Sequence, residues 1–300
     1  MAWIFISVAA AAFQTFRFML QKHLSMGALS AGGATSARFV YSVPFVVSLA
    51  LGYVLWRGVG VPQLGPVFWA YALSGGLAQI LATWCVVALF AARNFAVGIT
   101  FKKTEVVQTA ILGLLVLGDR VSVPGMAAIV LGLVGVLVLS DTAASGDGGW
   151  ARRFMNRGAG LGLLSGAFFA VSAVGYRGAT LEVASDDAFL RAVVSLAVVT
   201  TAQAIGMALW LIWREPGQMG KVFAARRTAV WMGITGMAGS LCWFTAFTLQ
   251  NAAYVFAVGQ VEVIFSLAAS VLFFRERLSR REGAGIALIS ASVLLLVLLL

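Results

Sequence analysis

Long apolar stretches separated by short polar segments make up most of this sequence. A helix that crosses a bilayer needs about 20 mostly apolar residues, and glycine, proline and clustered charges divide the chain into ten stretches of that kind. We place these stretches at residues 2–21, 32–55, 66–90, 94–117, 122–140, 158–179, 188–213, 228–249, 252–274 and 283–300. The pattern predicts an all-α membrane protein with ten transmembrane helices.

Composition agrees with this prediction. Hydrophobic residues make up 61% of the 300 residues and charged residues 11%, and the mean hydropathy is +0.96, whereas a soluble domain has about 25% charged residues. The net charge of +10 favours basic loops that contact anionic lipid headgroups, and no basic run interleaved with aromatic residues indicates nucleic-acid binding. We expect a multi-pass protein of the cell membrane, in a bacterium the inner membrane, with lipids but no nucleic acid as partners.

Part of the sequence forms an internal repeat. Glu105 and Glu262 are 157 positions apart, and the same shift aligns other uncommon residue types without a gap. These further matches are Gly76 with Gly233, Cys85 with Cys242, Phe90 with Phe247, Asn94 with Asn251, Arg120 with Arg277, and Ser122 with Ser279. A shift of 161 aligns residues 95–98 with 256–259 instead, but it matches commoner residue types. The preferred register indicates an internal duplication in a membrane protein.

The duplication divides the chain into two halves. A polar, small-residue linker at 141–157 separates a first five-helix repeat at 1–140 from a second at 158–300. Because five is odd, the second repeat must enter the membrane from the opposite side, which predicts an inverted repeat with a pseudo-two-fold axis in the membrane plane. Both repeats lie in one chain, so a monomer is possible, and the sequence leaves the oligomeric state open.

Each repeat carries the same short motif in its fourth helix. Glu105 is followed fourteen residues later by the acidic residue of Leu117-Gly-Asp-Arg120, and Glu262 by that of Phe274-Arg-Glu-Arg277. Near the start of the second helix lies Arg38-Phe39. With these motifs the chain resembles the drug/metabolite transporter superfamily, in particular its EamA-type two-repeat permeases. The resemblance implies a membrane transporter of small molecules.

The chain departs from the family pattern at two places. Proline commonly follows the fourth-helix glutamate in this family, whereas Val106 and Val263 stand here. The small multidrug resistance relatives carry a carboxylate in the first helix, where this chain has Gln14 and Arg17. Export of lipophilic cations through such a carboxylate is therefore not expected.

Two glutamates and two lysines are the first candidate site residues. A charge at the bilayer centre costs about 2.5–3.5 kcal/mol on insertion scales, so a persistent one usually faces protein or a water-filled cavity. Glu105 and Glu262 lie mid-span, which leaves two interpretations: they line a transport pathway, or they accept hydrogen bonds that fix the helices. Counting 100° per residue, Lys102 shares the face of Glu105 and can pair with it, whereas Lys103 points roughly opposite. We expect at least one lysine to serve the pathway.

Further candidates surround this centre. Gln14 and Arg17 lie in the first helix, and because Arg17 is only a few residues from the helix end, snorkelling to the interface is the favoured interpretation. The remaining substrate-binding or coupling candidates are the aromatic Tyr176, Trp84 and Trp243, and the paired Asn94 and Asn251. Cys85, Cys242 and the single histidine, His23, do not assemble a zinc site, a redox pair or a Ser-His pair. The sequence predicts no metal, no cofactor and no enzymatic activity.

We therefore expect a secondary transporter that moves a small polar metabolite by alternating access. The lysines favour an anionic or zwitterionic substrate, such as an amino acid or organic acid. Import or export, and proton coupling or facilitation, stay open. The alternatives are an intramembrane enzyme that uses Glu105 and Glu262, and a channel or structural membrane subunit.

Membrane orientation gives a first testable prediction. With ten spans, the odd-numbered loops carry thirteen basic residues against three in the termini and even-numbered loops, so the positive-inside rule predicts that both termini lie outside. The family usually has cytoplasmic termini. Fusion of alkaline phosphatase and, separately, of a fluorescent protein to Leu300 should give active phosphatase. A fluorescent, phosphatase-negative C-terminus would contradict the basic-residue count.

Overall fold

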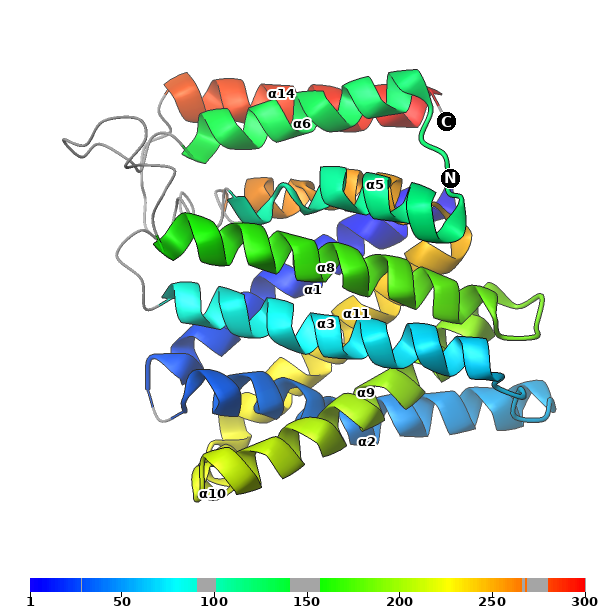
Figure 1. Ribbon diagram of the computed structural model, residues 1–300, viewed down its shortest axis with the longest axis vertical. Helices are drawn as coiled ribbons and strands as arrows, with labels where there is room; N and C mark the ends of the chain where they lie inside the picture. Colours follow the sequence, from blue (N-terminus) through cyan, green and yellow to red (C-terminus); the bar gives the residue numbers. More distant parts are fainter. Residues whose placement is uncertain (28, 91–100, 141–156, 266–267, 269–279, 300) are drawn as a thin grey trace.

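The computed structural model describes residues 1–27, 29–90, 101–140, 157–265, 268 and 280–299, and every secondary-structure element named in these ranges is an α-helix. The helices are α1 (Ala2–Ser25), α2 (Ala31–Arg57), α3 (Pro66–Phe90), α5 (Glu105–Leu117), α6 (Val123–Ser140), α8 (Arg157–Leu181), α9 (Ala188–Arg214), α10 (Gln218–Ala224), α11 (Arg226–Leu249), α12 (Ala252–Gly259) and α14 (Arg280–Leu299). They run back and forth along one direction, and the two labelled termini lie at the same end (Figure 1). The predicted all-α class is confirmed.

Six of these helices are long and apolar enough to cross a membrane. They are Ala2–Ser25, Ala31–Arg57, Pro66–Leu89, Gly158–Leu181, Ala188–Arg214 and Arg226–Leu249. Shorter apolar helices occur at Glu105–Leu117, Val123–Val138, Ala252–Phe265 and Gly283–Leu298. The structure thus has multiple apolar spans, as expected for a multi-pass membrane protein.

Two predicted helices differ from the structure, and one helix was not predicted. The expected helix at 94–117 is interrupted by a turn at 103–104, so α5 begins at Glu105, and residues 94–100 lie outside the described part. The expected helix at 252–274 is interrupted at Gln260 and resumes at 261–265. The apolar pattern does not reveal either break, because it is read over about 20 residues and both stretches remain mostly apolar over that length, although Lys102 and Glu105 flank the first break. The short α10 occupies a segment expected to be a loop.

Local sequence explains where the helices begin and end. Ser30 caps α2 by accepting a hydrogen bond from the Gly33 amide at 2.9 Å, and Gly58 ends that helix in the left-handed conformation at φ 62°. Asp187 caps α9 by accepting bonds from the amides of Phe189 and Leu190. The hydroxyl of Tyr53 donates to the same carboxylate at 2.7 Å, and this bond holds the pKa of Asp187 below its usual value.

The helices pack in pairs, and the outer pairs lie on either side of a central set of helices. The most extensive contacts join α3 with α8, α6 with α14, α1 with α11, and α2 with α9. In Figure 1 the α6–α14 pair lies at the top and α2, α9 and α10 lie at the bottom, with α1, α3, α5, α8 and α11 between them. The largest buried hydrophobic cluster draws on α1, α3, α8, α11 and α12, among others. The core is therefore centred where these helices meet.

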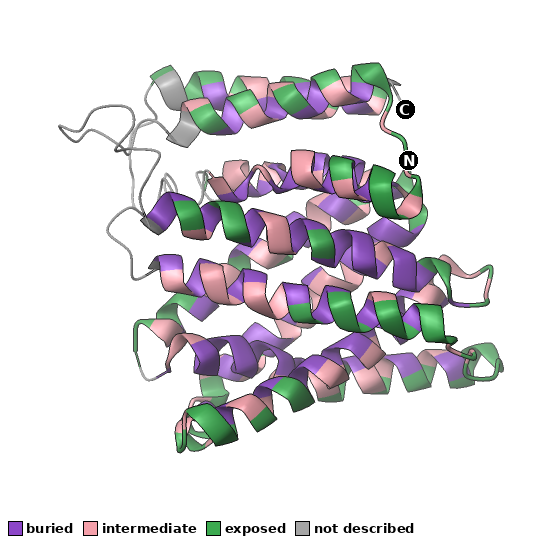
Figure 2. Cartoon of the chain, viewed as in Figure 1, coloured by how far each residue is buried: buried purple, intermediate pink, exposed green. Residues whose placement is uncertain are grey.

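Many large apolar side chains face outward. Phe5, Leu115 and Leu209 are 76%, 74% and 63% exposed, and exposed positions recur along the outer faces of the helices (Figure 2). A water-soluble protein rarely exposes this much contiguous apolar surface, whereas lipid tails solvate it without cost. The distribution of exposed residues therefore agrees with a membrane location.

Glycines allow α3 and α8 to approach closely. A methyl group added at Gly175 would lie 2.9 Å from the Cα atom of Gly75 and 2.9 Å from the carbonyl oxygen of Tyr71, both on α3. A methyl group at Gly178 would meet the ring of Tyr71 at 2.7 Å. Small residues at such contacts let helix backbones pack directly, which is the main source of helix association in lipid.

The α3–α8 contact can be tested with one substitution. Gly175→Ala places a carbon against backbone atoms that cannot rotate away, so we expect a loss of about 1–3 kcal/mol in unfolding free energy. Gly160→Ala on the same helix is the matched control, because a methyl group there meets nothing within 4 Å. Thermal unfolding of both variants in detergent measures the effect. Equal midpoints would show that α3 and α8 do not pack as closely as described.

Candidate functional site

The two predicted glutamates follow interruptions in their helices. In the first half the Thr104 amide bonds to the Phe101 carbonyl at 3.2 Å, and α5 then begins at Glu105. In the second half the Gln260 amide bonds to the Ala257 carbonyl at 3.3 Å, two residues before Glu262. Both bonds span three residues rather than four, so each is a turn tighter than an α-helix. Corresponding positions of the two halves thus carry a break next to a buried carboxylate.

Two lysines pair with these carboxylates. Lys103 Nζ lies 2.8 Å from Glu262 Oε2, and Lys102 Nζ lies 3.2 Å from Glu105 Oε1. Both lysine side chains are 3% exposed. Breaking such a buried pair leaves a charge without compensation, which is strongly unfavourable. The pairs therefore make these charges tolerable at the centre of the protein.

Lys103 does not point away from this centre, contrary to the helical-face prediction. That prediction counted residues along one continuous helix, whereas residues 103–104 form a turn. The turn redirects Lys103 across to Glu262 while Lys102 still pairs with Glu105, three residues on, as expected. The aromatic rings of Phe18 and Phe169 lie 5.7 and 4.8 Å from Lys102 Nζ. Both lysines consequently belong to one cluster.

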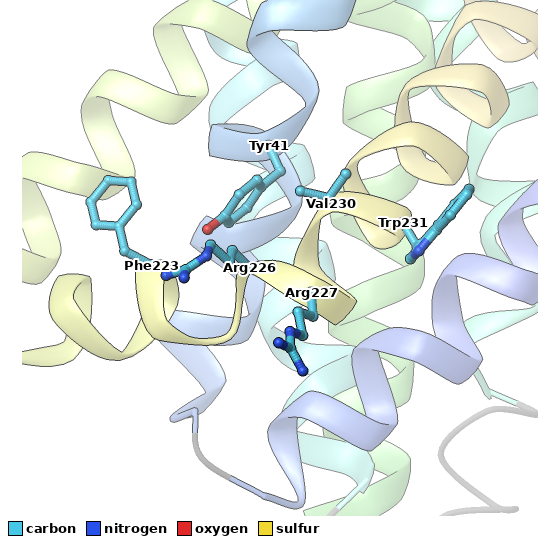
Figure 3. Close-up of a pocket in the computed structure, with 6 residues that line it drawn as sticks. All are labelled: Tyr41, Phe223, Arg226, Arg227, Val230 and Trp231. Carbon is cyan, nitrogen blue, oxygen red and sulfur yellow. The ribbon is translucent and has the colours of Figure 1, made fainter.

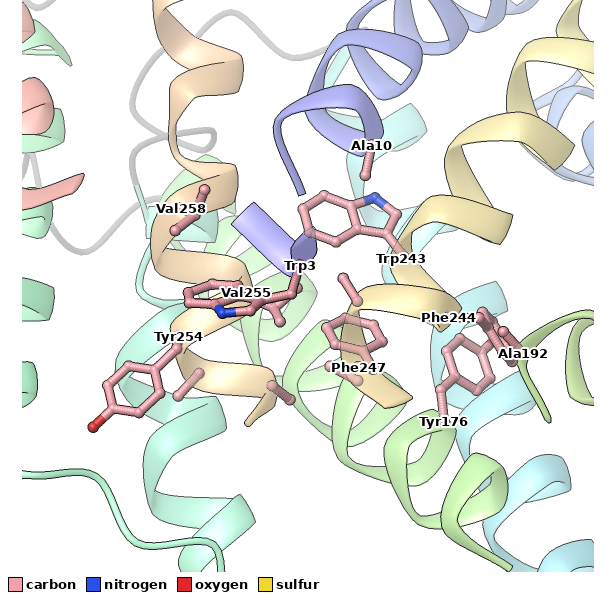
Figure 4. Close-up of a cluster of buried hydrophobic side chains, with 14 of the residues drawn as sticks. Trp3, Ala10, Tyr176, Ala192, Trp243, Phe244, Phe247, Tyr254, Val255 and Val258 are labelled. Atoms are coloured by element: carbon pink, nitrogen blue, oxygen red, sulfur yellow. The ribbon is translucent and has the colours of Figure 1, made fainter. Parts of the chain in front are cut away.

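Gln14 and Trp243 complete the surroundings of Glu262. Gln14 Nε2 donates to Glu262 Oε2 at 3.1 Å, and Trp243 Nε1 donates to Gln14 Oε1 at 3.2 Å. The Trp243 ring stacks on Phe247, with centroids 5.8 Å apart (Figure 4). A methyl group at Gly259 would come within 2.4 Å of the same indole. Packing therefore fixes the indole, the indole orients the amide, and the amide holds the carboxylate.

These residues enclose a small cavity of about 20 Å³. It is lined by Gln14, Lys102, Glu105, Phe169, Trp243, Phe256, Gly259 and Glu262. A cavity needs about 10–15 Å³ to hold one water molecule, whereas small-molecule sites usually measure about 300–1,000 Å³. The cluster is thus closed around roughly one water-sized space, and a metabolite can enter only if the helices move apart.

Arg17 is buried rather than snorkelling to the interface, which corrects the favoured expectation. It is 2% exposed, its Nη1 donates to Gln21 Oε1 at 2.8 Å, and its guanidinium lies 4.0 Å from the Phe18 ring. Arg38 is 5% exposed and donates to the hydroxyls of Thr83 and Ser240, each at 3.2 Å. Packing of α2 and α11 against α1 buries Arg17, and its distance from the helix end does not reveal this.

The other predicted residues have separate surroundings. The Tyr176 hydroxyl donates to Gln79 Oε1 at 2.9 Å and accepts from Gln203 Nε2 at 3.2 Å. Trp84 packs edge-on against Trp210, with centroids 4.6 Å apart. The expected aromatic residues thus lie in different places, and of the three only Trp243 lines the small cavity.

Of the two asparagines that correspond in the sequence, the structure describes only Asn251. Asn251 caps α12 by accepting a bond from the Ala253 amide at 2.9 Å. Asn94 lies outside the described residues. The described asparagine therefore has a local role in starting its helix.

The acidic residue of the first Gly-Asp-Arg turn also has a defined partner. Asp119 accepts bonds from Arg177 Nε at 2.5 Å and Nη2 at 3.1 Å. Arg177 Nη1 donates in addition to the carbonyls of Phe247 and Gln250. The turn after α5 is thereby tied to α8 and to the end of α11, so this motif residue joins the two halves.

A larger pocket opens on the outer surface. It measures about 630 Å³ and is lined by Tyr41, Phe223, Arg226, Arg227, Val230 and Trp231, between α2, α10 and α11 (Figure 3). Arginine and tryptophan near helix ends are typical of the membrane interface. The position of this pocket at the helix ends separates it from the buried charges.

Among the described residues no group of three His, Cys, Asp or Glu is placed to hold a metal ion.

Several site residues were not among the sequence candidates. Phe169 and Phe256 line the cavity, and Gln79 and Gln203 bond to Tyr176. Arg38 belongs to the Arg38-Phe39 motif of the sequence, and an arginine that is the eighth residue of an apolar helix is itself a signal of a buried polar site. The two phenylalanines carry no such signal, because aromatic residues are common throughout the sequence.

Comparison with known proteins adds three findings. Residues 156–298 match the EamA-like transporter family. A curated protein of Sinorhizobium sp., described as "Uncharacterized transporter in cobO 3'region", is 32% identical over 139 residues, which cover 45% of this chain and 92% of that protein. A solved structure described as "Crystal structure of protein" superposes with a TM-score of 0.74 at 18% identity, covering 99% of this chain and 97% of the other. The last likeness concerns the fold alone.

The Lys103–Glu262 pair can be tested by removing one or both charges. Lys103→Met leaves Glu262 without its nearest cation, so the unfolding free energy should fall by about 3–5 kcal/mol. The double variant Lys103→Met/Glu262→Leu should regain most of this loss, because no single buried charge remains. Thermal unfolding in detergent provides the measurement, with the exposed Lys22→Met as control. A double variant less stable than Lys103→Met would contradict the pairing.

Proposed function

Because this chain belongs to the EamA-like transporter family and is a membrane transporter of the drug/metabolite type, we propose that it carries a small zwitterionic or anionic metabolite by alternating access. Amino acids and organic acids are the substrate classes that fit. The observation that carries the proposal is the buried Lys103–Glu262 pair, which joins the two halves of the chain. The curated relative comes from a bacterium, which supports placement in a bacterial inner membrane.

The pairing of helices supports two inverted five-helix repeats with ten spans. If α1, α2 and α3 of residues 1–140 correspond to α8, α9 and α11 of residues 158–300, the α3–α8 and α1–α11 contacts are equivalent. The α2–α9 and α6–α14 contacts then each join an element to its own counterpart. In Figure 1, α1 and α8 run in opposite directions. The Sinorhizobium protein, matched over 92% of its length by 45% of this chain, is about the size of one repeat.

The contacts between the halves suggest how opening works. Lys103 and Gln14 of the first half both donate to Glu262 of the second half, and Asp119 of the first half accepts from Arg177 of the second. When the halves rock apart, the central contacts must break to enlarge the cavity of about 20 Å³. Alternating access of this kind is a common mode of transporters with inverted repeats.

A zwitterionic substrate can exchange for the central ion pair. Its ammonium group would take the place of Lys103 beside Glu262, and its carboxylate would take the place of Glu262 beside Lys103. Each buried charge would then keep an opposite partner. The attraction between the substrate and these charges would offset the free-energy cost of separating Lys103 from Glu262. A neutral apolar compound offers no such partner. This complementarity is the reason to prefer charged metabolites as cargo.

The chain would work as a transporter without a cofactor, metal or nucleic acid, and as a monomer if both repeats suffice. An intramembrane enzyme that uses Glu105 and Glu262 would need at least one of these carboxylates to leave its lysine and act on a bond. A channel would show flux that does not saturate. Counterflow of a labelled metabolite in proteoliposomes separates the three, because only a carrier exchanges labelled for unlabelled substrate.

Glutamate variants give the sharpest test of the proposed site. In counterflow with a panel of labelled amino acids and organic acids, Glu262→Gln should lower exchange about tenfold or more, since a hydrogen bond to a charged group contributes about 1.5–3 kcal/mol. Glu105→Gln should weaken transport as well, because it frees Lys102 from its partner. Glu182→Gln is the control, since Glu182 is exposed. Normal exchange and an unchanged pH profile in the double variant would remove both glutamates from the mechanism.

A further inference from the structure

The buried charges of the described residues do not balance. Six Asp, Glu, Lys or Arg side chains are buried in this part of the chain: Arg17, Arg38, Lys102, Lys103, Glu105 and Glu262. Each lysine pairs with one glutamate, whereas neither arginine lies within ion-pair distance of a carboxylate in the described part of the chain. Among the described residues, two positive charges are therefore left without a carboxylate at ion-pair distance, in a region where an uncompensated charge is strongly unfavourable.

The two arginines also have hydrogen-bonding capacity that neighbouring groups do not fill. A guanidinium offers five N–H donors and no acceptor. Arg17 uses Nη1 to bond Gln21, and its buried Nη2 has no hydrogen-bond partner among the residues that the structure describes. Within the described part of the chain, Arg38 bonds two neutral hydroxyls, those of Thr83 and Ser240. A buried donor without an acceptor is rare in native proteins and indicates a missing partner.

Both side chains converge on one small-residue position of α11. A methyl group added at Gly236 would lie 3.4 Å from Arg17 Cδ, 3.4 Å from Arg38 Cγ and 3.7 Å from Ser42 Oγ. These are ordinary contact distances to the aliphatic parts of both side chains, so the position of Gly236 has room for one methyl group beside the two arginines. The two guanidinium charges are close enough to repel each other, while Glu262 attracts Arg17.

This arrangement lies next to the central cavity. The Phe18 ring is 4.0 Å from the Arg17 guanidinium and 5.7 Å from Lys102 Nζ, so it contacts both. Lys102 lines the cavity. Arg17 and the Lys–Glu cluster therefore lie against the same aromatic ring.

We propose that Arg17 and Arg38 form an anion-binding subsite, separate from the place beside Lys103, that receives a carboxylate of the transported substrate before it exchanges for the Lys103–Glu262 pair. The planar guanidinium fork matches a carboxylate in geometry and charge better than an ammonium does. Such an anion would supply an opposite charge and give Arg17 Nη2 an acceptor. This inference rests on the proposed transport function for the origin of the carboxylate, although anion binding itself can be measured without transport.

Binding of small anions to the purified protein tests the proposal. Thermal unfolding in detergent is recorded with acetate, with glycine and with chloride, at constant ionic strength set by a bulky organic sulfonate. Acetamide and glycinamide serve as neutral or carboxylate-free analogues of similar size. We expect acetate and glycine to stabilise the wild-type protein in a saturable manner, and their amides to have no such effect.

Variants locate the binding. Arg17→Gln and Arg38→Gln should each weaken acetate binding about tenfold or more, as expected for loss of a charged hydrogen bond. Gly236→Ala keeps both charges and fits at contact distance, so it should fold and still weaken binding by occupying the space. The controls are Lys22→Gln, exposed on α1, and Gly206→Ala, where a methyl group meets nothing within 4 Å. Both controls should bind acetate as the wild-type protein does.

The outcomes separate the possibilities. Equal acetate binding in wild type, Arg17→Gln, Arg38→Gln and Gly236→Ala, or no binding to any protein, would overturn the proposal. Stabilisation by chloride but not by acetate or glycine would overturn the carboxylate assignment and indicate a resident halide. Acetate binding that depends on the arginines supports the subsite even if counterflow detects no exchange, in which case the transport proposal alone fails.

Discussion

A charge inside a bilayer is stable only beside a group that replaces its lost hydration, and this constraint governs the centre of the protein. Backbone groups meet the same requirement by forming helices, since lipid offers them no hydrogen-bond partners. Side chains meet it at the centre through Lys102 with Glu105 and Lys103 with Glu262. The position of Gln14 follows as well, because its amide donates to Glu262 and accepts from the indole of Trp243.

The same requirement links stability to movement. Because Lys103 and Glu262 lie in different halves, the contact that makes their charges tolerable also holds the halves together. Opening would leave two unpaired charges unless other charged groups replace the lost partners, and in the proposed exchange the substrate supplies those groups. Under the proposed mechanism the protein would resist opening when empty and would open more readily when cargo is present, which is the behaviour that coupled exchange requires.

The sequence was sufficient for the fold class, the family and the positions of the two glutamates, because apolar length, repeat register and rare charges are one-dimensional signals. It failed where neighbouring helices decide the outcome. Arg17 was expected to snorkel, but α2 and α11 bury it beside Arg38. Lys103 was expected to point away, because the turn at 103–104 cannot be read from helical periodicity. Trp84 packs on Trp210, a partner 126 positions away that no local pattern reveals.

The helix interruptions explain how carboxylates can lose and regain partners. Glu105 is the first residue of α5, where amide groups have no intrahelical acceptor and the helix dipole favours negative charge. Glu262 lies two residues after the turn at Gln260, close to the start of the resumed helix. A carboxylate in such a position keeps part of its stabilisation when its lysine departs, whereas a lysine in mid-helix would keep none. In the proposed exchange, the breaks would therefore lower the cost of an intermediate in which the ion pair has parted and the substrate has not yet replaced it.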